Sequence, residues 1–180
     1  MLDKEIFEIN VKNISSKEEA LTYLSDKLIE KGIVKESYKE AILNREKVFP
    51  TGLQFEKYGI AIPHTDVEHV NKEQIAVMTL ENPVSFYQMG TNDVEVSVKV
   101  IFMLALKEAH SQLTILQQLI EILQDKEIME KLMNMDEYTT SKEVKELLAI
   151  LVNPDKKYLF TLEERESMIH ETIKGLDNVR

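Results

Sequence analysis

The segment that most constrains the fold is residues 94–106, VEVSVKVIFMLAL. Its first half alternates between apolar and polar side chains, which is typical of a strand with one face on a core and the other on solvent. From residue 101 onward every side chain is apolar, which indicates a strand covered on both faces. We therefore predict one long strand, exposed on one face at its start and buried on both faces at its end.

Shorter apolar segments predict three further strands, at residues 7–11, 60–62 and 75–80. The run 60–62 lies between Gly59 and Pro63, which fits a buried strand that ends in a turn. The Asn-Pro pair at residues 82–83 and the GTND stretch at residues 90–93 predict the turns that lead toward the long strand. We expect residues 51–58 to form a loop.

Helical periodicity marks most of the remaining chain. Ser16 and Glu19 have the spacing of a capping box, and the apolar stripe that follows them ends at Gly32. A second helix is predicted over residues 37–48, with Pro50 just beyond its end. Further helices are predicted at residues 113–123, 125–133, 141–151 and 162–176.

Together these elements predict one α/β domain over residues 1–152 and a C-terminal helical extension over residues 153–180. Pro154 breaks the pattern between the two. A length of 180 residues and a hydrophobic content of 43% are enough for one domain with a buried core. We assign no function to the extension.

Composition excludes several classes of function. A formal net charge of −10 argues against nucleic acid as a partner, because its phosphates demand a basic surface. The absence of cysteine excludes disulfides and thiolate metal sites and agrees with a reducing cytoplasm. No apolar run approaches the roughly 20 residues of a membrane-spanning helix, and no signal peptide is visible. We expect a soluble, cytoplasmic protein without direct membrane insertion.

Two of the four histidines follow predicted strands. His64 comes after the short buried strand through Pro63, and His110 comes shortly after the long strand, near the start of a helix. The carboxyl ends of strands are where open α/β sheets gather ligands and chemistry. His69 lies in a polar stretch, and we interpret it as an ordinary turn or helix residue; we interpret His170 as an exposed helix residue.

A phosphate is the ligand that this pattern favours. If the two strands are neighbours, His64 and His110 would converge, and the free N–H groups of the helix that starts there would favour an anion. Arg45, near the end of the second helix, would add a guanidinium that binds two phosphoryl oxygens at once. On the residues alone, structural roles for the two histidines and a solvated Arg45 stay open.

The stretch REKVFPTG at residues 45–52, then Glu56 and GIAIPH at residues 59–64, resembles the fructose–mannitol superfamily of enzyme IIA components, in detail its galactitol-type branch. In that family an arginine precedes a Pro-Thr-Gly segment, and a strand followed by proline carries the phosphorylated histidine. His110 and the leucines after it match the family's second histidine and leucine-rich helix. The resemblance extends over residues 16–151.

This resemblance implies a mixed β-sheet flanked by helices on both faces, and a phosphoryl relay without metal ion or cofactor. Phosphorylated HPr donates to His64, which passes the group to a IIB component. The sugar is then phosphorylated as its membrane IIC carrier brings it in. Arg45 and His110 are implied as stabilisers of the transferring group. Thr65 departs from the pattern, because many relatives carry glycine there, but this change does not remove the nucleophile.

On chemical grounds we expect Nε2 of a neutral His64 to be the attacking atom. Nδ1 should donate to a backbone carbonyl, because that bond fixes the tautomer that leaves Nε2 free. Two other functions stay as alternatives. One is a regulatory IIA-like phosphoprotein that signals to a transporter, kinase or transcription factor. The other is a metal-dependent hydrolase that uses His64, Asp66 and His110.

Overall fold

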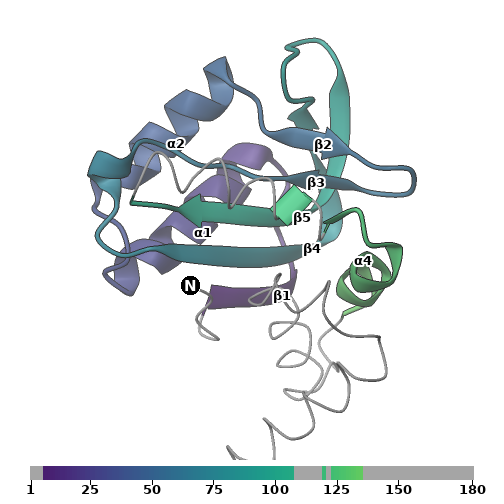
Figure 1. Ribbon diagram of the computed structural model, residues 1–180, viewed down its shortest axis with the longest axis horizontal. Helices are drawn as coiled ribbons and strands as arrows, with labels where there is room; N and C mark the ends of the chain where they lie inside the picture. The colour runs from purple at the N-terminus through teal and green to yellow at the C-terminus, as the bar shows by residue number, and fades with distance from the viewer. Residues whose placement is uncertain (1–5, 108–118, 121–122, 136–180) are drawn as a thin grey trace, which may run out of the picture.

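The computed structural model describes residues 6–107, 119–120 and 123–135. Within these residues, five strands form one mixed sheet in the order β1-β4-β5-β3-β2 (Figure 1). The strands are β1 (Phe7–Val11), β2 (Gly52–Gln54), β3 (Gly59–Ala61), β4 (Gln74–Tyr87) and β5 (Glu95–Ala105). The helices of the same segments are α1 (Lys17–Glu30), α2 (Ser37–Val48), the 3-10 helix η2 (Val67–His69) and α4 (Lys126–Met133).

Strand β5 lies at the centre of the sheet and divides the core in two. Val98 and Ile101 pack on one face with residues of α1 and α2, whereas Val100 and Phe102 pack on the other face with residues of α4. Each such fully buried side chain stabilises the fold by about 1.5–3 kcal/mol. The α/β class, with helices on both faces of a mixed sheet, is confirmed. The half-exposed start and buried end of the long strand are confirmed as well.

The turn predicted at residues 82–83 is wrong, because β4 continues through these positions. β4 pairs antiparallel with β5 at both of its ends, with a register shift between Thr79 and Val84. The Asn-Pro pair lies in this irregular stretch, where a strand tolerates a proline that cannot donate a ladder hydrogen bond. The chain reverses at the predicted GTND turn, where Gly90 has a φ of +81°.

The loop predicted at residues 51–58 contains the short strand β2, which pairs antiparallel with β3. Gly52 begins this strand, and a Cβ at this position would lie 2.5 Å from the carbonyl oxygen of Tyr87. Only glycine allows the two backbones to approach so closely. A strand of three residues shows no alternation that sequence analysis can detect, which explains the missed element.

Both predicted N-terminal helices are confirmed. α1 follows Ser16, whose Oγ accepts a hydrogen bond from the N–H of Glu19 at 3.2 Å. The Glu19 carboxylate accepts from the N–H and Oγ of Ser15 rather than from the N–H of the N-cap itself. α2 has its predicted bounds. Its buried face is formed by residues spaced four apart, namely Tyr38, Ile42 and Glu46.

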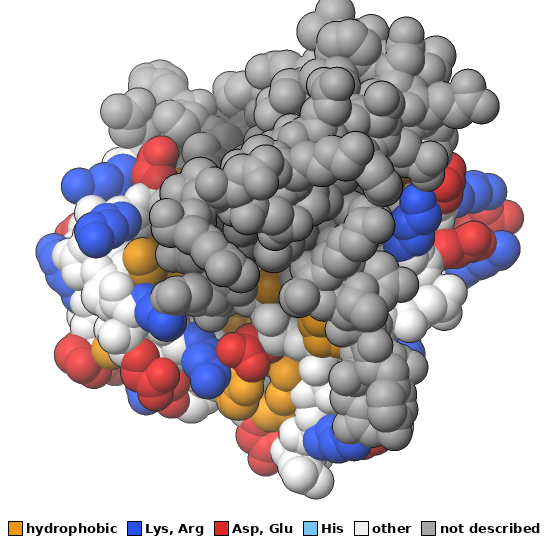
Figure 2. All heavy atoms as spheres, turned by 90° about the horizontal axis from the view of Figure 1, so that it is seen from below, with side chains coloured by type: hydrophobic (Ala, Val, Ile, Leu, Met, Phe, Trp, Pro, Cys, Tyr) orange, Lys and Arg blue, Asp and Glu red, His pale blue; other side chains and the backbone are white. Residues whose placement is uncertain are grey.

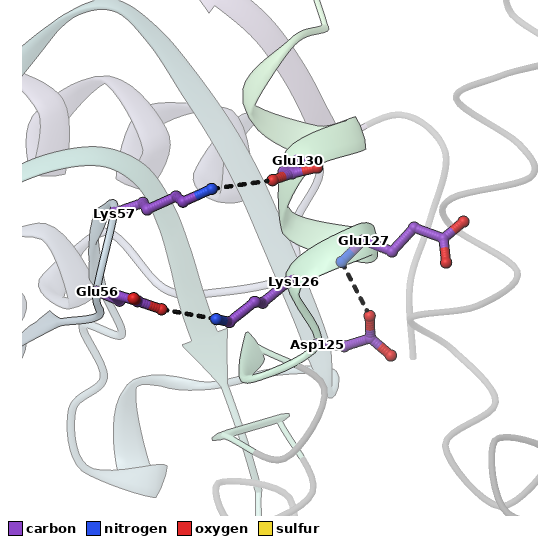
Figure 3. Close-up of polar contacts among 6 residues, drawn as sticks. All are labelled: Glu56, Lys57, Asp125, Lys126, Glu127 and Glu130. Atoms are coloured by element: carbon purple, nitrogen blue, oxygen red, sulfur yellow. Dashed lines mark hydrogen bonds and ion pairs between the residues drawn. The ribbon is translucent and has the colours of Figure 1, made fainter.

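Helix α4 contacts the tip of the β2–β3 hairpin (Figure 3). Lys126 Nζ lies 2.7 Å from Glu56 Oε2, and Lys57 Nζ lies 3.6 Å from Glu130 Oε1. Asp125 caps the helix through its side chain, as the predicted start of this helix requires. Exposed ion pairs contribute little to stability, so the apolar side chains that α4 buries against the sheet hold it in place.

Several predictions fall outside the described residues, namely the helices at residues 141–151 and 162–176 and the boundary between residues 152 and 153. Of the helix predicted at residues 113–123, residues 119–120 and 123 are described and are helical. Within the described segments, no helix is long and apolar enough to cross a membrane.

The charges on one face of the molecule are mixed (Figure 2). Lysine or arginine and aspartate or glutamate side chains lie close together on both flanks of this face, around hydrophobic side chains nearer its centre. The described side chains of this face therefore form no continuous basic area of the kind that binds nucleic acid.

Candidate functional site

His64 lies where the chain leaves β3 and stays beside β5. β3 pairs parallel with β5, and the pairing resumes beyond Pro63 as a bridge between His64 and Leu104. The N–H of Leu104 donates to the carbonyl of Pro63 at 2.9 Å. Because Leu104 belongs to the buried end of β5, the core of the sheet holds the backbone that carries the histidine.

The imidazole of His64 has one bonded nitrogen and one nitrogen available for chemistry. Nδ1 lies 2.9 Å from the carbonyl oxygen of Ile62. A carbonyl can only accept, so Nδ1 carries the proton and Nε2 keeps its lone pair. The predicted hydrogen bond from Nδ1 to a backbone carbonyl is confirmed. Nε2 faces Arg45, whose Nη2 lies 3.5 Å away.

Burial lowers the pKa of His64, because the charged imidazolium loses hydration in this position. The hydrogen bond to Ile62 acts in the opposite direction, Arg45 lowers the pKa further, and Asp66 raises it. The pKa of His64 therefore lies below the ordinary histidine value, which favours the neutral ring. A neutral ring with a free Nε2 is the nucleophilic form of histidine.

Arg45 extends from the last turn of α2 to the ring of His64. Its Nη1 lies 3.8 Å from Asp66 Oδ1, and its guanidinium carbon lies 5.4 Å from the ring centroid of Phe49. Its Nε–H is buried and has no hydrogen-bond partner within the described part of the chain. The guanidinium therefore presents hydrogen-bond donors beside the free nitrogen of the histidine, which suits an anionic group bound there.

Sequence analysis gave no role to Glu46 and Thr51, which lie directly behind this site. Both are buried, and the Glu46 carboxylate accepts two hydrogen bonds from Thr51. One signal points to them in retrospect. A glutamate at the position that continues the buried stripe of α2 needs a specific partner, because an unpaired buried carboxylate is costly.

The other histidines are only partly described. His110 and His170 lie outside the described residues. The condition for His110 to approach His64 is met, since β3 and β5 are parallel neighbours. His69 belongs to η2, as its interpretation as a turn or helix residue requires, and its Nδ1 lies 2.9 Å from Ser37 Oγ.

The described residues contain no group of three or more histidine, aspartate or glutamate side chains placed to hold a metal ion. The carboxylate of Asp66 instead lies beside the guanidinium of Arg45. The hydrolase alternative thus gains no support from this part of the chain.

The same architecture occurs in solved proteins of known class. The crystal structure of IIA mannitol from Escherichia coli matches with a TM-score of 0.66 at 28% identity, covering 82% of this chain and 99% of that one. The complex of enzyme IIAMTL and phosphorylated enzyme IIBMTL from Escherichia coli matches with a TM-score of 0.65 at 28% identity, covering 83% of this chain and 99% of the matched chain. The fold is that of the mannitol-type IIA domains.

Sequence comparison agrees with the fold. The family model described as "Phosphoenolpyruvate-dependent sugar phosphotransferase system, EIIA 2" matches residues 1–151. The galactitol-specific EIIA component of Escherichia coli K12 is 33% identical over 119 residues, which cover 66% of this chain and 79% of that protein. This chain belongs to the EIIA type 2 family of the sugar phosphotransferase system. It is a phosphotransferase, a phosphoryl-transfer component of that system.

Proposed function

We propose that His64 accepts the phosphoryl group from phosphorylated HPr on Nε2 and passes it to a IIB component. One observation supports this assignment: Nδ1 is bonded to the Ile62 carbonyl, while Nε2 is unprotonated and has only the long contact of 3.5 Å to Nη2 of Arg45 among the described residues. A histidine with an unprotonated Nε2 and a guanidinium suited to phosphoryl oxygens thus lie side by side, which supports the proposal.

The transfer balances without any further reactant. The lone pair of Nε2 attacks phosphorus in line as the N–P bond to the donor histidine breaks, and the electron pair of that bond returns to the donor ring. The proton stays on Nδ1 throughout, in its hydrogen bond to the carbonyl oxygen of Ile62. Arg45 binds the equatorial oxygens, where negative charge is spread as the group passes. His110 is proposed as a second donor to the same oxygens.

The acceptor in this proposal is a IIB component, which delivers the group to a sugar brought in by a membrane IIC carrier. The solved complex of a IIA domain with phosphorylated IIB, from a protein of the same fold, supports this choice. Galactitol or a related sugar is proposed from the identity to the galactitol-specific component. The relay takes place in the cytoplasm, which is therefore the proposed location.

A labelling assay tests the assignment. HPr is first phosphorylated with enzyme I and phosphoenolpyruvate labelled in its phosphoryl group and is separated from both. Purified protein is then incubated with this phosphorylated HPr, with and without excess chelator. We expect wild type and His69→Ala to be labelled and His64→Ala to remain unlabelled, because His69 contacts Ser37 and lies outside the proposed relay. Full labelling of His64→Ala would contradict the assignment, and loss of labelling in chelator would contradict a metal-free relay.

A regulatory phosphoprotein is the alternative, and a second stage of the assay distinguishes it from a transport component. Labelled protein is mixed with candidate IIB proteins. Rapid loss of label from His64 to one of them supports the transport relay. Retention of label with every IIB protein encoded beside this chain favours regulation.

A further inference from the structure

Glu46 occupies a position where the helix pattern calls for an apolar side chain. With Tyr38 and Ile42 it forms the buried face of α2, and only 2% of the residue is exposed. A carboxylate is expensive to bury unless hydrogen bonds compensate it. Its presence on this face therefore calls for a specific role in the local structure.

Both oxygens of the Glu46 carboxylate bind the same residue. Oε1 accepts from the backbone N–H of Thr51 at 3.0 Å, and Oε2 accepts from Thr51 Oγ1 at 2.6 Å. Thr51 is itself buried, and it is the last residue of the connection between α2 and β2. Two bonds to one partner fix the rotation of the last turn of α2 as well as its distance from the sheet.

Hydrogen bonds continue from Thr51 to the ring of His64. The carbonyl of Thr51 accepts from the N–H of Ile62 at 3.2 Å. The carbonyl of Ile62 in turn accepts from Nδ1 of His64 at 2.9 Å. The series of hydrogen bonds begins at Glu46, and Arg45 is the residue next to Glu46 in α2. The helix that carries the guanidinium is therefore connected to the imidazole through a series of buried and half-buried hydrogen bonds.

The direct contacts of Arg45 are too weak to hold it alone. Its ion pair with Asp66 measures 3.8 Å, and 75% of the Asp66 side chain is exposed. Pairs as exposed as this are screened by water and contribute little. Buried hydrogen bonds behind the site have no such screening, so they are better suited to set the position of the guanidinium.

We propose that Glu46 and Thr51 are positioning residues that hold Arg45 at the distance from Nε2 of His64 at which it binds the transferring phosphoryl group. This inference rests on the proposed function. It predicts that loss of the Glu46–Thr51 hydrogen bonds slows phosphoryl transfer because Arg45 is displaced, and not because the protein unfolds.

The first test compares rates of His64 labelling by phosphorylated HPr at saturating donor. Thr51→Val removes the hydroxyl and should slow labelling between about 10- and 100-fold, as small displacements of catalytic groups do. Thr51→Ser keeps the hydroxyl and should be slowed much less. Thr79→Val is the matched control, because Thr79 is an equally buried threonine whose Oγ1 accepts from Asn10 N–H, on the far side of β5. It should lose stability without losing rate.

A companion pair changes the glutamate. Glu46→Gln can keep both bonds, with its amide oxygen accepting from the N–H of Thr51 and its amide group donating to Oγ1. Glu46→Leu removes both bonds while filling a similar volume. We expect the glutamine variant to be clearly faster than the leucine variant. Equal rates in the two variants would overturn the inference. The proposed role of Glu46 depends on its hydrogen bonds to Thr51, which only the glutamine variant can keep.

The decisive measurement is a double-mutant cycle with Arg45. In an Arg45→Ala background, Thr51→Val should slow labelling no further, because the group that Thr51 helps to position is absent. An additive loss, or a Thr51→Val single variant at the wild-type rate, would overturn the inference and leave the proposed function intact. An unlabelled wild type would overturn both. Melting temperatures of all variants confirm that folded protein is compared.

Discussion

Nη2 of Arg45 lies 3.5 Å from Nε2 of His64, across residues separated by 19 positions in the chain. This distance is at the long limit of a hydrogen bond, so the pair gains little direct stabilisation. Nδ1 of the histidine is bonded to the carbonyl of Ile62, and the guanidinium lies near Phe49 and Asp66. A guanidinium held beside a free ring nitrogen is suited to bind an anion attached to that nitrogen.

Replacement of Arg45 tests this relationship. We expect Arg45→Ala to slow phosphoryl transfer roughly 100-fold, in line with the loss of a charge-stabilising donor elsewhere. Arg45→Lys should recover only part of the rate, because an ammonium keeps the charge and loses the bidentate geometry. Lys47→Ala, an exposed cation of the same helix turn, is the control and should keep the wild-type rate. A comparable loss in Lys47→Ala would point to net charge instead.

His110→Ala should slow transfer by a similar factor of roughly 100 if its imidazole also binds the phosphoryl oxygens. The measurement is the same single-turnover labelling of His64. His170→Ala serves as the histidine control from the segment that we interpret as an exposed helix. A wild-type rate in His110→Ala would remove His110 from the mechanism while leaving the roles of His64 and Arg45 unaffected.

The protonation of His64 should respond in opposite directions to its two charged neighbours. Because burial lowers its pKa, we expect NMR titration of the ring to give a midpoint below the ordinary value of about 6.5. Arg45→Ala should raise this midpoint, and Asp66→Asn should lower it. The acid limb of the transfer rate should move with the midpoint in Asp66→Asn. Shifts of the same sign in both variants would contradict the electrostatic assignment.

Glu46 should make the stability of the fold depend on pH. Burial raises the pKa of Glu46 above its ordinary value of 4.5. The folded protein therefore binds the proton more tightly than the unfolded chain. The corresponding stability is fully present below pH 4.5 and is lost as pH rises through the folded pKa.

The comparison of Glu46→Gln with wild type measures this effect. The glutamine variant should gain stability relative to wild type as pH rises from 4 to 7. Urea unfolding at each pH measures the free energy of unfolding of both proteins. Glu40→Gln, an exposed glutamate on the same helix, should show no such trend. If wild type instead gained stability relative to Glu46→Gln as pH rose, the pKa of Glu46 would be lowered in the folded protein, and the prediction would be wrong.

Gly59 should be intolerant of any side chain. A Cβ at this position would lie 2.3 Å from the Ser97 carbonyl oxygen, a backbone atom of β5 that cannot move freely. We expect Gly59→Ala to destabilise the fold by about 3 kcal/mol in urea unfolding, at the upper end of overpacking costs. Gly90→Ala meets no atom within 4 Å and should cost only about 1 kcal/mol for its positive φ. Equal costs would contradict the close approach of β3 to β5.

Sequence analysis succeeded where the signal lies within one element. The alternation and later apolar run of β5 report how each face is covered, and the bounds of α2 follow from local periodicity and Pro50. It failed at β2, which is too short for a pattern, and at the Asn-Pro pair, where β4 continues through a register shift instead of the expected turn. In both cases the chain is extended because it pairs with another strand. The residues of these segments carry no local signal of that pairing.

For the proposed site, the sequence by itself determined the place of His64 at the end of β3 and its tautomer, because Pro63 follows the strand and the carbonyl that binds Nδ1 is only two residues away. The tertiary structure alone decided which groups surround the free nitrogen. Arg45 reaches Nε2, and Glu46 reaches Thr51, only because α2 packs on the sheet beside β3. Contacts of this kind depend on the docking of separate elements, and local sequence carries no record of their relative rotation and distance.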